Sequence, residues 1–494
     1  MNSSLLLWGM LILPAIGAAW VLLPGLSVQT ILKLLVAGVL AVSALGMPLI
    51  WQVFAAGPVQ LVDGWLFLDA LSAYHLVVLL VVFSLSSLFA MRYFGFEYRS
   101  GIFDALQARK LAALWFGTLA AMVLVLISGN LGLMWVGIEA TTLLTAFLIC
   151  VHLTPVALEA MWKYLLICSV GVAFAFMGTI LVASCGRAAG LGDTAALQWT
   201  RLMAVAPRLD PATLKMGFLF LLVGYGTKVG LAPFHNWLPD AHSQAPAPVS
   251  ALFSGFMLNA ALYCLMRYVP LVEQSTGNAG WSRQLLVGFG ILSILLAAAF
   301  IIFQHDVKRL LAYHSIEHMG IIALGIGLGG LGTFAALFHV FNHSICKSLG
   351  FFCAGRLGQL YQTHDMRSIV GALRTAPVWG GGLLGSLLAL IGFAPFALFM
   401  SEFQIMQAAV ASGAFWSLGL FVLGVGVVFV GALGHAITIA FGEPVSGIPA
   451  EAAGWLDRVI VYLPLSALLL LGVWMPGFVI KALEQAAHVL GTAL

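Results

Sequence analysis

Long apolar stretches separated by short polar segments organise this chain. A membrane-spanning helix needs about 20 mainly apolar residues. We predict fourteen such helices, near residues 4–24, 30–54, 66–91, 111–128, 131–152, 163–184, 215–236, 249–270, 285–304, 314–331, 333–355, 379–400, 415–441 and 460–480. The connecting segments are too short for a soluble catalytic domain. The pattern therefore predicts an all-α integral membrane protein that crosses the bilayer many times.

Composition supports that class and excludes others. Hydrophobic residues make up 62% of the chain and charged residues only 8%, whereas a soluble domain carries about 25% charged residues. The net charge of +3 is too small to indicate nucleic-acid binding. The six cysteines form no C-x-x-C pair, which argues against a zinc, iron–sulfur or thioredoxin-like site.

The distribution of Lys and Arg predicts the orientation. Odd-numbered loops hold ten basic residues, while even-numbered loops and the C-terminal segment hold seven, Arg267 among them. Cytoplasmic loops carry the excess of positive charge, so we expect the odd loops in the cytoplasm and both termini outside. No basic residue precedes the first stretch, unlike a signal peptide, and we expect it to be a retained helix.

A short repeat suggests internal symmetry. Gly-Leu-Ala-Pro-Phe at 230–234 recurs as Gly-Phe-Ala-Pro-Phe at 392–396, and Lys163 in the sixth helix matches Lys347 in the eleventh. An offset of five helices, an odd number, places consecutive copies in opposite topology. We therefore predict three N-terminal helices (1–110), two inverted five-helix repeats (111–270 and 271–441) with broken helices 7 and 12, and a final helix (442–494). Broken helices in inverted repeats are typical of ion-coupled transporters.

Several charges lie inside apolar stretches, where each costs about 2.5–3.5 kcal/mol. Glu139 is in the middle of the fifth helix, and Lys228 precedes the Gly-Pro break of the seventh. We predict that this carboxylate faces a partner lysine, with Lys228 the best candidate, or a water-filled path, so that moving a neighbouring charge would load or unload the lysine's proton. The alternatives are a carboxyl that is paired for helix packing and one that is simply protonated.

The eleventh helix carries His339, His343 and Lys347 at positions i, i+4 and i+8, on one face. A spacing of about 6 Å along the axis lets single waters bridge these groups, and histidine both accepts and donates protons. Histidines bonded to carbonyls of neighbouring helices are the structural alternative. A zinc site is not expected, because no Glu follows the first His as in H-E-x-x-H.

Other polar residues near predicted membrane interfaces are candidates for proton uptake, release or coupling. Helix capping, loop hydrogen bonding and snorkelling are the alternatives. The candidates are Lys163, His235, Asp240, His242, His314, Glu317, His318 and Glu402.

One long motif resembles a known family. The stretch from Lys228 to Ala251 is similar to the signature of antiporter-like subunits of respiratory complex I, multi-subunit cation/proton antiporters and group 4 membrane-bound hydrogenases. The segments 306–320 and 258–263 look most like the hydrogenase-4 component F branch, of formate hydrogenlyase type. The resemblance covers most of the chain and implies fourteen helices with two inverted five-helix units.

The resemblance also implies roles for individual residues. Glu139 corresponds to the family's acidic position in the fifth helix, and Lys228 to its essential lysine in the seventh. Lys347 corresponds to a lysine in the eleventh helix, with His343 beside it, and Glu402 to the ionisable residue of the second broken helix. Complex I homologues often carry a central lysine in the eighth helix, where this chain has Asn259. Asparagine cannot titrate, so water or a histidine must fill that gap.

From these features we expect a proton-translocating subunit of a membrane oxidoreductase, most similar to a formate hydrogenlyase-like hydrogenase. The chain carries no redox motif of its own, so we expect no cofactor in it, and iron–sulfur and NiFe centres in partner subunits. Expected partners are other membrane subunits, a soluble hydrogenase or dehydrogenase arm, lipid and protons, in a bacterial or archaeal cell (inner) membrane. A stand-alone or multi-subunit Na⁺/H⁺ antiporter and a non-conducting scaffold subunit are the alternatives.

Overall fold

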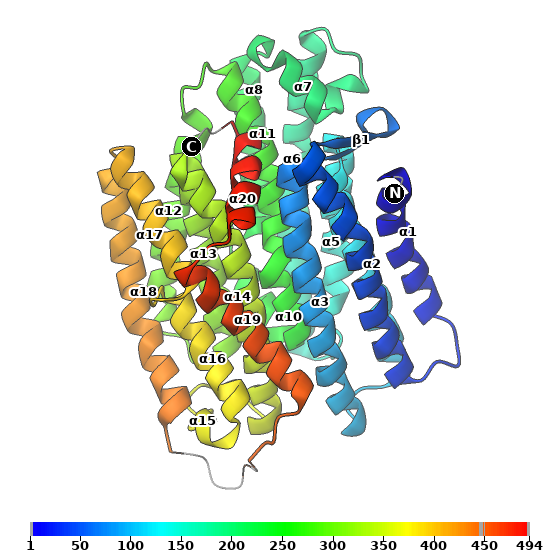
Figure 1. Ribbon diagram of the computed structural model, residues 1–494, viewed down its shortest axis with the longest axis vertical. Coiled ribbons are helices and arrows are strands. Elements are labelled where there is room, and N and C mark those ends of the chain that lie inside the picture. The colour runs from blue at the N-terminus through cyan, green and yellow to red at the C-terminus, as the bar shows by residue number, and fades with distance from the viewer. Residues whose placement is uncertain (1–2, 444–447, 449, 492–494) are drawn as a thin grey trace.

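The computed structural model describes residues 3–443, 448 and 450–491. The described chain is almost entirely helical, and most of its long helices run roughly along the longest axis of the molecule (Figure 1). Eleven of the described helices are long and apolar enough to cross a membrane. The predicted class, an all-α integral membrane protein, is confirmed.

The N-terminal part consists of three long helices and one small hairpin. Its elements are α1 (Ser3–Val21), α2 (Val28–Ala56), β1 (Val59–Leu61), β2 (Leu66–Leu68) and α3 (Ala70–Arg99). The two strands pair antiparallel, with Val59 opposite Leu68. Asp69 follows β2 and caps α3, because its carboxylate accepts a hydrogen bond from the Ser72 amide at 3.0 Å.

The next part holds the first broken helix. Its long helices are α4 (Ala105–Ile127), α5 (Leu131–Ile149), α6 (Pro155–Ala188) and α8 (Pro211–Val229), with the short α7 (Trp199–Val205) before α8. After the break come α9 (Leu238–Gln244), α10 (Ala247–Leu252) and α11 (Leu258–Ser275). A π-helical turn, Phe253–Met257, joins α10 to α11 in one membrane span.

The third part holds the second broken helix. Its elements are α12 (Trp281–Ile301), α13 (Val307–Leu328), α14 (Leu331–Tyr361), α15 (Ala372–Thr375), α16 (Pro377–Leu390), α17 (Ala397–Ala411) and α18 (Phe415–Phe441). An 18-residue stretch of the span that α10 and α11 form, and one of α13, are fully buried inside the protein. These helices, with α14 beside them, form the interior of the bundle.

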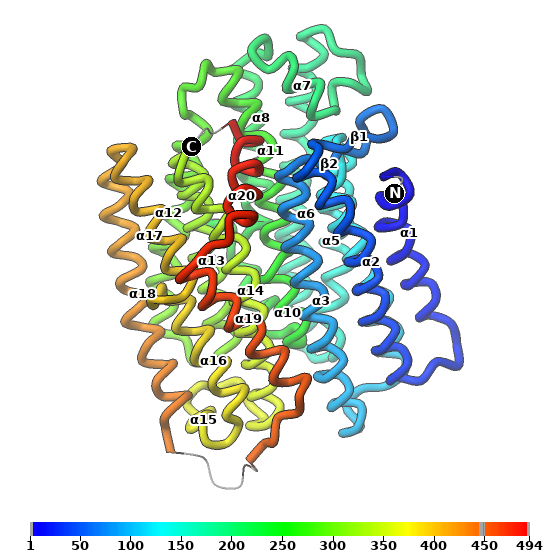
Figure 2. Tube along the Cα trace, in the orientation of Figure 1, coloured from blue at the N-terminus to red at the C-terminus, as the bar shows by residue number. Residues whose placement is uncertain are grey.

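The C-terminal part differs from the prediction of one final helix. The stretch 460–480 covers two helices, α19 (Trp455–Val473) and α20 (Gly477–Val489). Pro476 precedes α20 as its N-cap residue, and proline cannot continue a preceding helix. Figure 2 shows α19 crossing the bundle obliquely, where it contacts α14, α16 and α17, while α20 packs on α3 and α14.

Both predicted helix breaks are present. Helix α8 ends at Val229 and is followed by Gly230, whose φ of 80° is in the left-handed region. Gly392, shortly after α16, also has a positive φ, of 69°. In both breaks the Ala–Pro peptide is cis. Three of the predicted stretches fall on α8 and the break after it, on α14, and on α16 with the start of α17, outside the eleven candidate spans. The count of fourteen spans, the inverted relation of the repeats and the domain boundaries stay predictions.

Candidate functional site

Lys228 lies in the last turn of α8 and is fully buried. Its ammonium donates hydrogen bonds to the Thr142 hydroxyl at 3.0 Å and to the Tyr164 hydroxyl, and it lies 4.7 Å from the centre of the Tyr164 ring. Thr142 belongs to α5 and Tyr164 to α6. Two neighbouring helices, α5 and α6, therefore hold the lysine through neutral hydroxyl groups.

Glu139 is one turn before Thr142 on α5 and does not contact Lys228 directly. Its Oε1 accepts a hydrogen bond from the Ser169 hydroxyl at 3.1 Å, and its Oε2 is buried without a hydrogen-bond partner in the described part of the chain. The residue is half-buried, and Val136 and Leu143 beside it are exposed. In place of the expected direct pair, the acid bonds to Ser169 of α6 and the lysine bonds to Thr142 and Tyr164.

Lys347 is fully buried on α14. Its ammonium donates to the Leu311 carbonyl of α13 and lies 5.3 Å from the centre of the Phe351 ring. His343, one turn earlier, is buried too, and neither of its ring nitrogens has a hydrogen-bond partner among residues 3–443, 448 and 450–491. The second lysine thus stands beside a histidine with free hydrogen-bonding capacity.

A histidine cluster extends from His343 across α13 and α14. The rings of His318 and His343 lie 5.2 Å apart, and His318 Nδ1 lies 2.8 Å from His339 Nε2. His339 Nδ1 in turn lies 2.8 Å from the Ser401 hydroxyl on α17. The predicted histidine face of α14 is therefore half of a larger network that α13 and α17 complete.

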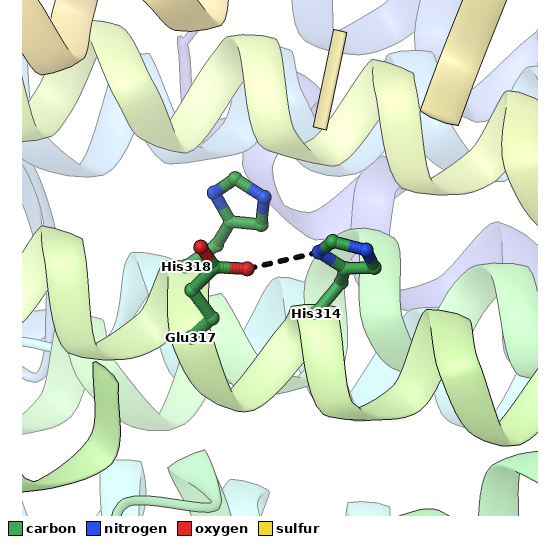
Figure 3. A group of neighbouring side chains, drawn as sticks. All are labelled: His314, Glu317 and His318. Atoms are coloured by element: carbon green, nitrogen blue, oxygen red, sulfur yellow. Dashed lines mark hydrogen bonds and ion pairs between the residues drawn. The ribbon is translucent and has the colours of Figure 1, made fainter. Parts of the chain in front are cut away.

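Glu317 and His318 do not lie near a membrane interface, and that prediction is wrong. Both are buried in the middle of α13 (Figure 3), where His314 Nδ1 lies 2.9 Å from the Glu317 carboxylate. The helix begins at Val307 rather than near residue 314, because Asp306 caps it by accepting hydrogen bonds from the amides of Lys308 and Arg309. The earlier start moves these side chains about two turns into the helix.

Glu402 lies on α17, five residues after its start, and is buried. Its carboxylate fills the space that a side chain at Gly392 would need, so it packs directly against the second helix break. A snorkelling interfacial acid is therefore excluded. One carboxylate oxygen instead lies within 4.8 Å of ring nitrogens of His318 and His339, in the histidine cluster.

Two groups in this cluster have ligand atoms close enough to hold a metal ion. They are His314 with Glu317 and His318, and His318 with His339 and Glu402, with the ligand atoms of each group within 4.8 Å of one another. Two imidazoles and one carboxylate are a donor set that binds zinc. The same groups can also pass protons, because each is an acid or a base with a hydrogen-bonded neighbour.

A surface network joins α6, α9 and α13. The Lys163 ammonium lies 2.7 Å from the Glu159 carboxylate and 3.1 Å from that of Asp240, whose other oxygen lies 2.7 Å from Arg309. The side chains of Lys163 and Arg309 are partly exposed. His235 is buried in the break between α8 and α9, with Nδ1 unpaired in the described structure. This network gives the broken helix a polar face toward solvent.

Asn259 occupies the centre of the bundle on α11. Its amide donates to the Ser344 hydroxyl of α14 at 3.0 Å and to the Gly255 carbonyl at 3.2 Å, while its own oxygen has no partner in the described chain. It therefore links α11 to α14 by hydrogen bonds but contributes no titratable group between the two lysines.

Sequence reasoning missed Tyr164, because a tyrosine in an apolar stretch carries no charge to mark it. It also placed Arg267 in a loop, which is wrong. Arg267 is buried on α11, since that helix continues to Ser275, and its guanidinium makes two 2.6 Å bonds to the Asp69 carboxylate. An ion pair between segments so far apart in the chain leaves no local pattern.

Comparison with known proteins gives a consistent result. Residues 128–428 match the family described as NADH:quinone oxidoreductase/Mrp antiporter, TM. The chain is 40% identical to the hydrogenase-4 component F homolog of Methylacidiphilum infernorum (isolate V4) over 364 residues, which are 73% of this chain and 75% of that one. It is 30% identical over 368 residues to hydrogenase-4 component B of Escherichia coli (strain K12), covering 72% of this chain and 52% of that relative.

Solved structures of membrane complexes contain chains of the same fold. A chain of the membrane-bound sulfane sulfur reductase, an archaeal respiratory membrane complex, superposes with a TM-score of 0.87 at 25% identity and covers 98% of this chain and 97% of its own length. A chain of the Mrp complex from Dietzia sp. DQ12-45-1b gives a TM-score of 0.84 at 19% identity, covering 99% and 97%. The second likeness concerns the fold alone.

Proposed function

The chain belongs to the NADH:quinone oxidoreductase/Mrp antiporter transmembrane family, and from this membership we propose that it is a proton-translocating membrane subunit of a respiratory-type oxidoreductase complex. The similarity to hydrogenase-4 components favours a membrane-bound hydrogenase complex related to formate hydrogenlyase. The chain supplies the proton path, and partner subunits supply the electron transfer.

One observation carries this proposal. Ionisable side chains are buried inside the helix bundle, with Lys228 on α8 and Lys347 and the histidine cluster on α13 and α14. Each intramembrane charge is costly, and such residues mark ion pathways. A subunit that served only as a scaffold would gain no stability from them.

The relay begins at Glu139 and ends at Glu402. A charge that moves in a partner subunit beside Glu139 changes the electrostatic potential at Lys228, which takes a proton from the cytoplasmic side past the Lys163–Asp240 network. Water passes the proton to Lys347. His343, His318 and His339 carry it on to Ser401 and Glu402 at the second break.

The surface of α5 beside Glu139 supports a partner there. Val136 and Leu143, about one turn before and after the acid, are exposed apolar residues, while Oε2 of Glu139 is buried within the chain. We infer that a neighbouring membrane subunit covers this face of α5 and acts on Glu139 through the electrostatic potential. Iron–sulfur and NiFe centres belong to the soluble arm of that complex, and this chain binds no cofactor.

The protein resides in a bacterial or archaeal cell (inner) membrane, with both termini outside. Na⁺/H⁺ exchange is the second candidate function, because the matched family includes Mrp antiporters and a chain of an Mrp complex shares the fold. The carboxylates Glu317 and Glu402 are oxygen ligands of the kind that Na⁺ accepts, so the ion has to be tested together with the path.

The experiment uses inverted membrane vesicles that hold the intact complex. Lys228→Ala and Lys347→Ala should each abolish substrate-driven proton uptake in vesicles with wild-type amounts of assembled complex. Lys215→Ala is the matched control, because Lys215 lies on α8 with Lys228 but packs over the Trp281 ring at 5.5 Å, away from the buried groups. Normal uptake in both relay variants would refute the path, and uptake that requires Na⁺ would favour the antiporter.

A further inference from the structure

The proton path has a gap at its centre. Lys228 and Lys347 lie on α8 and α14, and Asn259, on a helix that packs against α8 and bonded to Ser344 of α14, cannot titrate. Aromatic rings on α6, at the N-cap of α9, in the π-helical turn and on α14 lie near the two lysines, and we call this cluster the aromatic box. It consists of Tyr164, Trp237, Phe253 and Phe351.

Each lysine contacts one end of the aromatic box. The Lys228 ammonium donates to the Tyr164 hydroxyl, and the Tyr164 ring lies 5.0 Å from Trp237 and 6.1 Å from Phe253. The Lys347 ammonium lies 5.3 Å from the centre of the Phe351 ring. The box therefore extends from the first lysine to the second.

His242 is the titratable residue inside this box. Its ring lies 6.2 Å from Trp237, 5.9 Å from Phe253 and 5.8 Å from Phe351. Two of these rings, Trp237 and Phe253, also pack against Tyr164, which bonds to Lys228. The third, Phe351, lies next to the Lys347 ammonium. The residue is fully buried on α9, directly after the first helix break.

The two ring nitrogens of His242 are in different positions. Nδ1 lies 2.9 Å from the Leu238 carbonyl, one turn earlier on α9. A carbonyl can only accept, so Nδ1 carries the hydrogen of the neutral ring. Nε2 then holds the free lone pair, and it is buried with no hydrogen-bond partner in the part of the chain that the structure describes.

We propose that His242 is the proton carrier between Lys228 and Lys347, in place of the titratable residue that Asn259 lacks. The Lys228 ammonium gives up one proton, which water delivers to His242 Nε2, so that the lysine becomes a neutral amine and the imidazole an imidazolium. Nε2 then releases one proton through water to the neutral amine of Lys347, which becomes an ammonium. Nδ1 keeps its hydrogen and its bond to Leu238 throughout.

The chain provides a matched control for this role. His75 on α3 is also fully buried, bonds through Nδ1 to the carbonyl of Leu71 at 2.9 Å, and has an unpaired Nε2. Its aromatic neighbours are Tyr74 and Tyr263, and neither of these touches a relay lysine. The two histidines therefore share their local chemistry and differ in which groups surround them.

The test compares His242→Gln with His75→Gln in the intact complex, reconstituted in proteoliposomes, with proton uptake measured per electron transferred. Glutamine can donate and accept hydrogen bonds but does not titrate. We expect His242→Gln to lower uptake per electron at least tenfold and His75→Gln to leave it unchanged. The double variant His242→Gln/Asn259→Lys should regain a large part of the uptake, because a lysine then stands at the centre of the bundle.

The outcomes separate this inference from the proposed function on which it rests. If Lys228→Ala abolishes uptake while His242→Gln retains it, the carrier role is overturned and the proposed function stands. If the wild-type complex and Lys228→Ala behave alike, the proposed function itself fails. If the assembled double variant stays inactive, His242 acts by packing and the proposal is overturned. If the double variant does not assemble, the single variant His242→Lys is tested in its place. We expect it to retain proton uptake, and a loss of uptake would overturn the carrier role.

Discussion

Close packing between α6 and α8 positions Lys228, and it can be perturbed by a single methyl group. A Cβ atom at Gly224 would lie 2.4 Å from the Ala175 nitrogen and 2.6 Å from the Gly171 oxygen. Both are backbone atoms of α6, so no side-chain rotation can relieve the contact. An ordinary contact begins at 3.4 Å, so Gly224→Ala requires the two helices to separate locally by about 1 Å.

The separation acts directly on the first lysine. Gly224 lies one turn before Lys228 on α8, and Tyr164, which accepts the lysine's hydrogen bond, lies on α6. A misplacement of about 1 Å in a reacting group can lower a rate by about 100-fold. Overpacking of this kind costs about 1–3 kcal/mol of stability. We therefore expect Gly224→Ala to lower proton uptake by one to two orders of magnitude and to lower the unfolding temperature.

The assay pairs proton uptake with thermal unfolding of the purified complex. Gly426→Ala is the control, because Gly426 is also inside a helix, α18, but nothing lies within 4 Å of a Cβ atom there. Alanine is favoured over glycine in a helix interior by about 0.8–1 kcal/mol, so this variant should be slightly stabilised with unchanged uptake. Wild-type uptake and stability in Gly224→Ala would refute the reasoning.

Two further predictions concern groups outside the relay. Asp69→Asn leaves the buried Arg267 guanidinium without its counter-ion, so we expect the free energy of unfolding, measured by denaturant titration, to fall by about 3–5 kcal/mol. The double variant Asp69→Asn/Arg267→Gln should recover part of this loss. An unchanged free energy of unfolding in Asp69→Asn would contradict the prediction. Burial, with a smaller contribution from the Lys308 charge, lowers the pKa of His364 to about 3 in the loop after α14. The unfolded chain binds a proton at His364 below about pH 6.5, whereas the folded chain does not bind it until about pH 3. The folded state therefore loses stability as the pH falls from about 6.5 toward 3. The unfolding temperature should fall less between pH 7 and pH 4.5 in His364→Gln than in the wild type. Equal losses in both proteins would show that His364 is not responsible.

Much of the architecture was predictable from local patterns. Apolar stretches of spanning length predicted the helices, and a glycine followed by a proline predicted both interruptions, because neither residue supports a continuous helix. The Trp474–Pro476 segment was missed as a third interruption, since it lies inside an apolar stretch. The start of α13 was misplaced because the capping role of Asp306 was overlooked.

The sequence by itself determined that charges are buried in the membrane and on which helices they lie, since an apolar stretch that contains Glu139, Lys228 or Lys347 can be recognised without coordinates. Only the tertiary structure decided which groups meet. The contact of Lys228 with Tyr164 and the place of His242 among rings from four elements depend on how helices far apart in the chain rotate and pack against each other. Periodicity describes one helix at a time, whereas these contacts are set by the packing of several helices against one another.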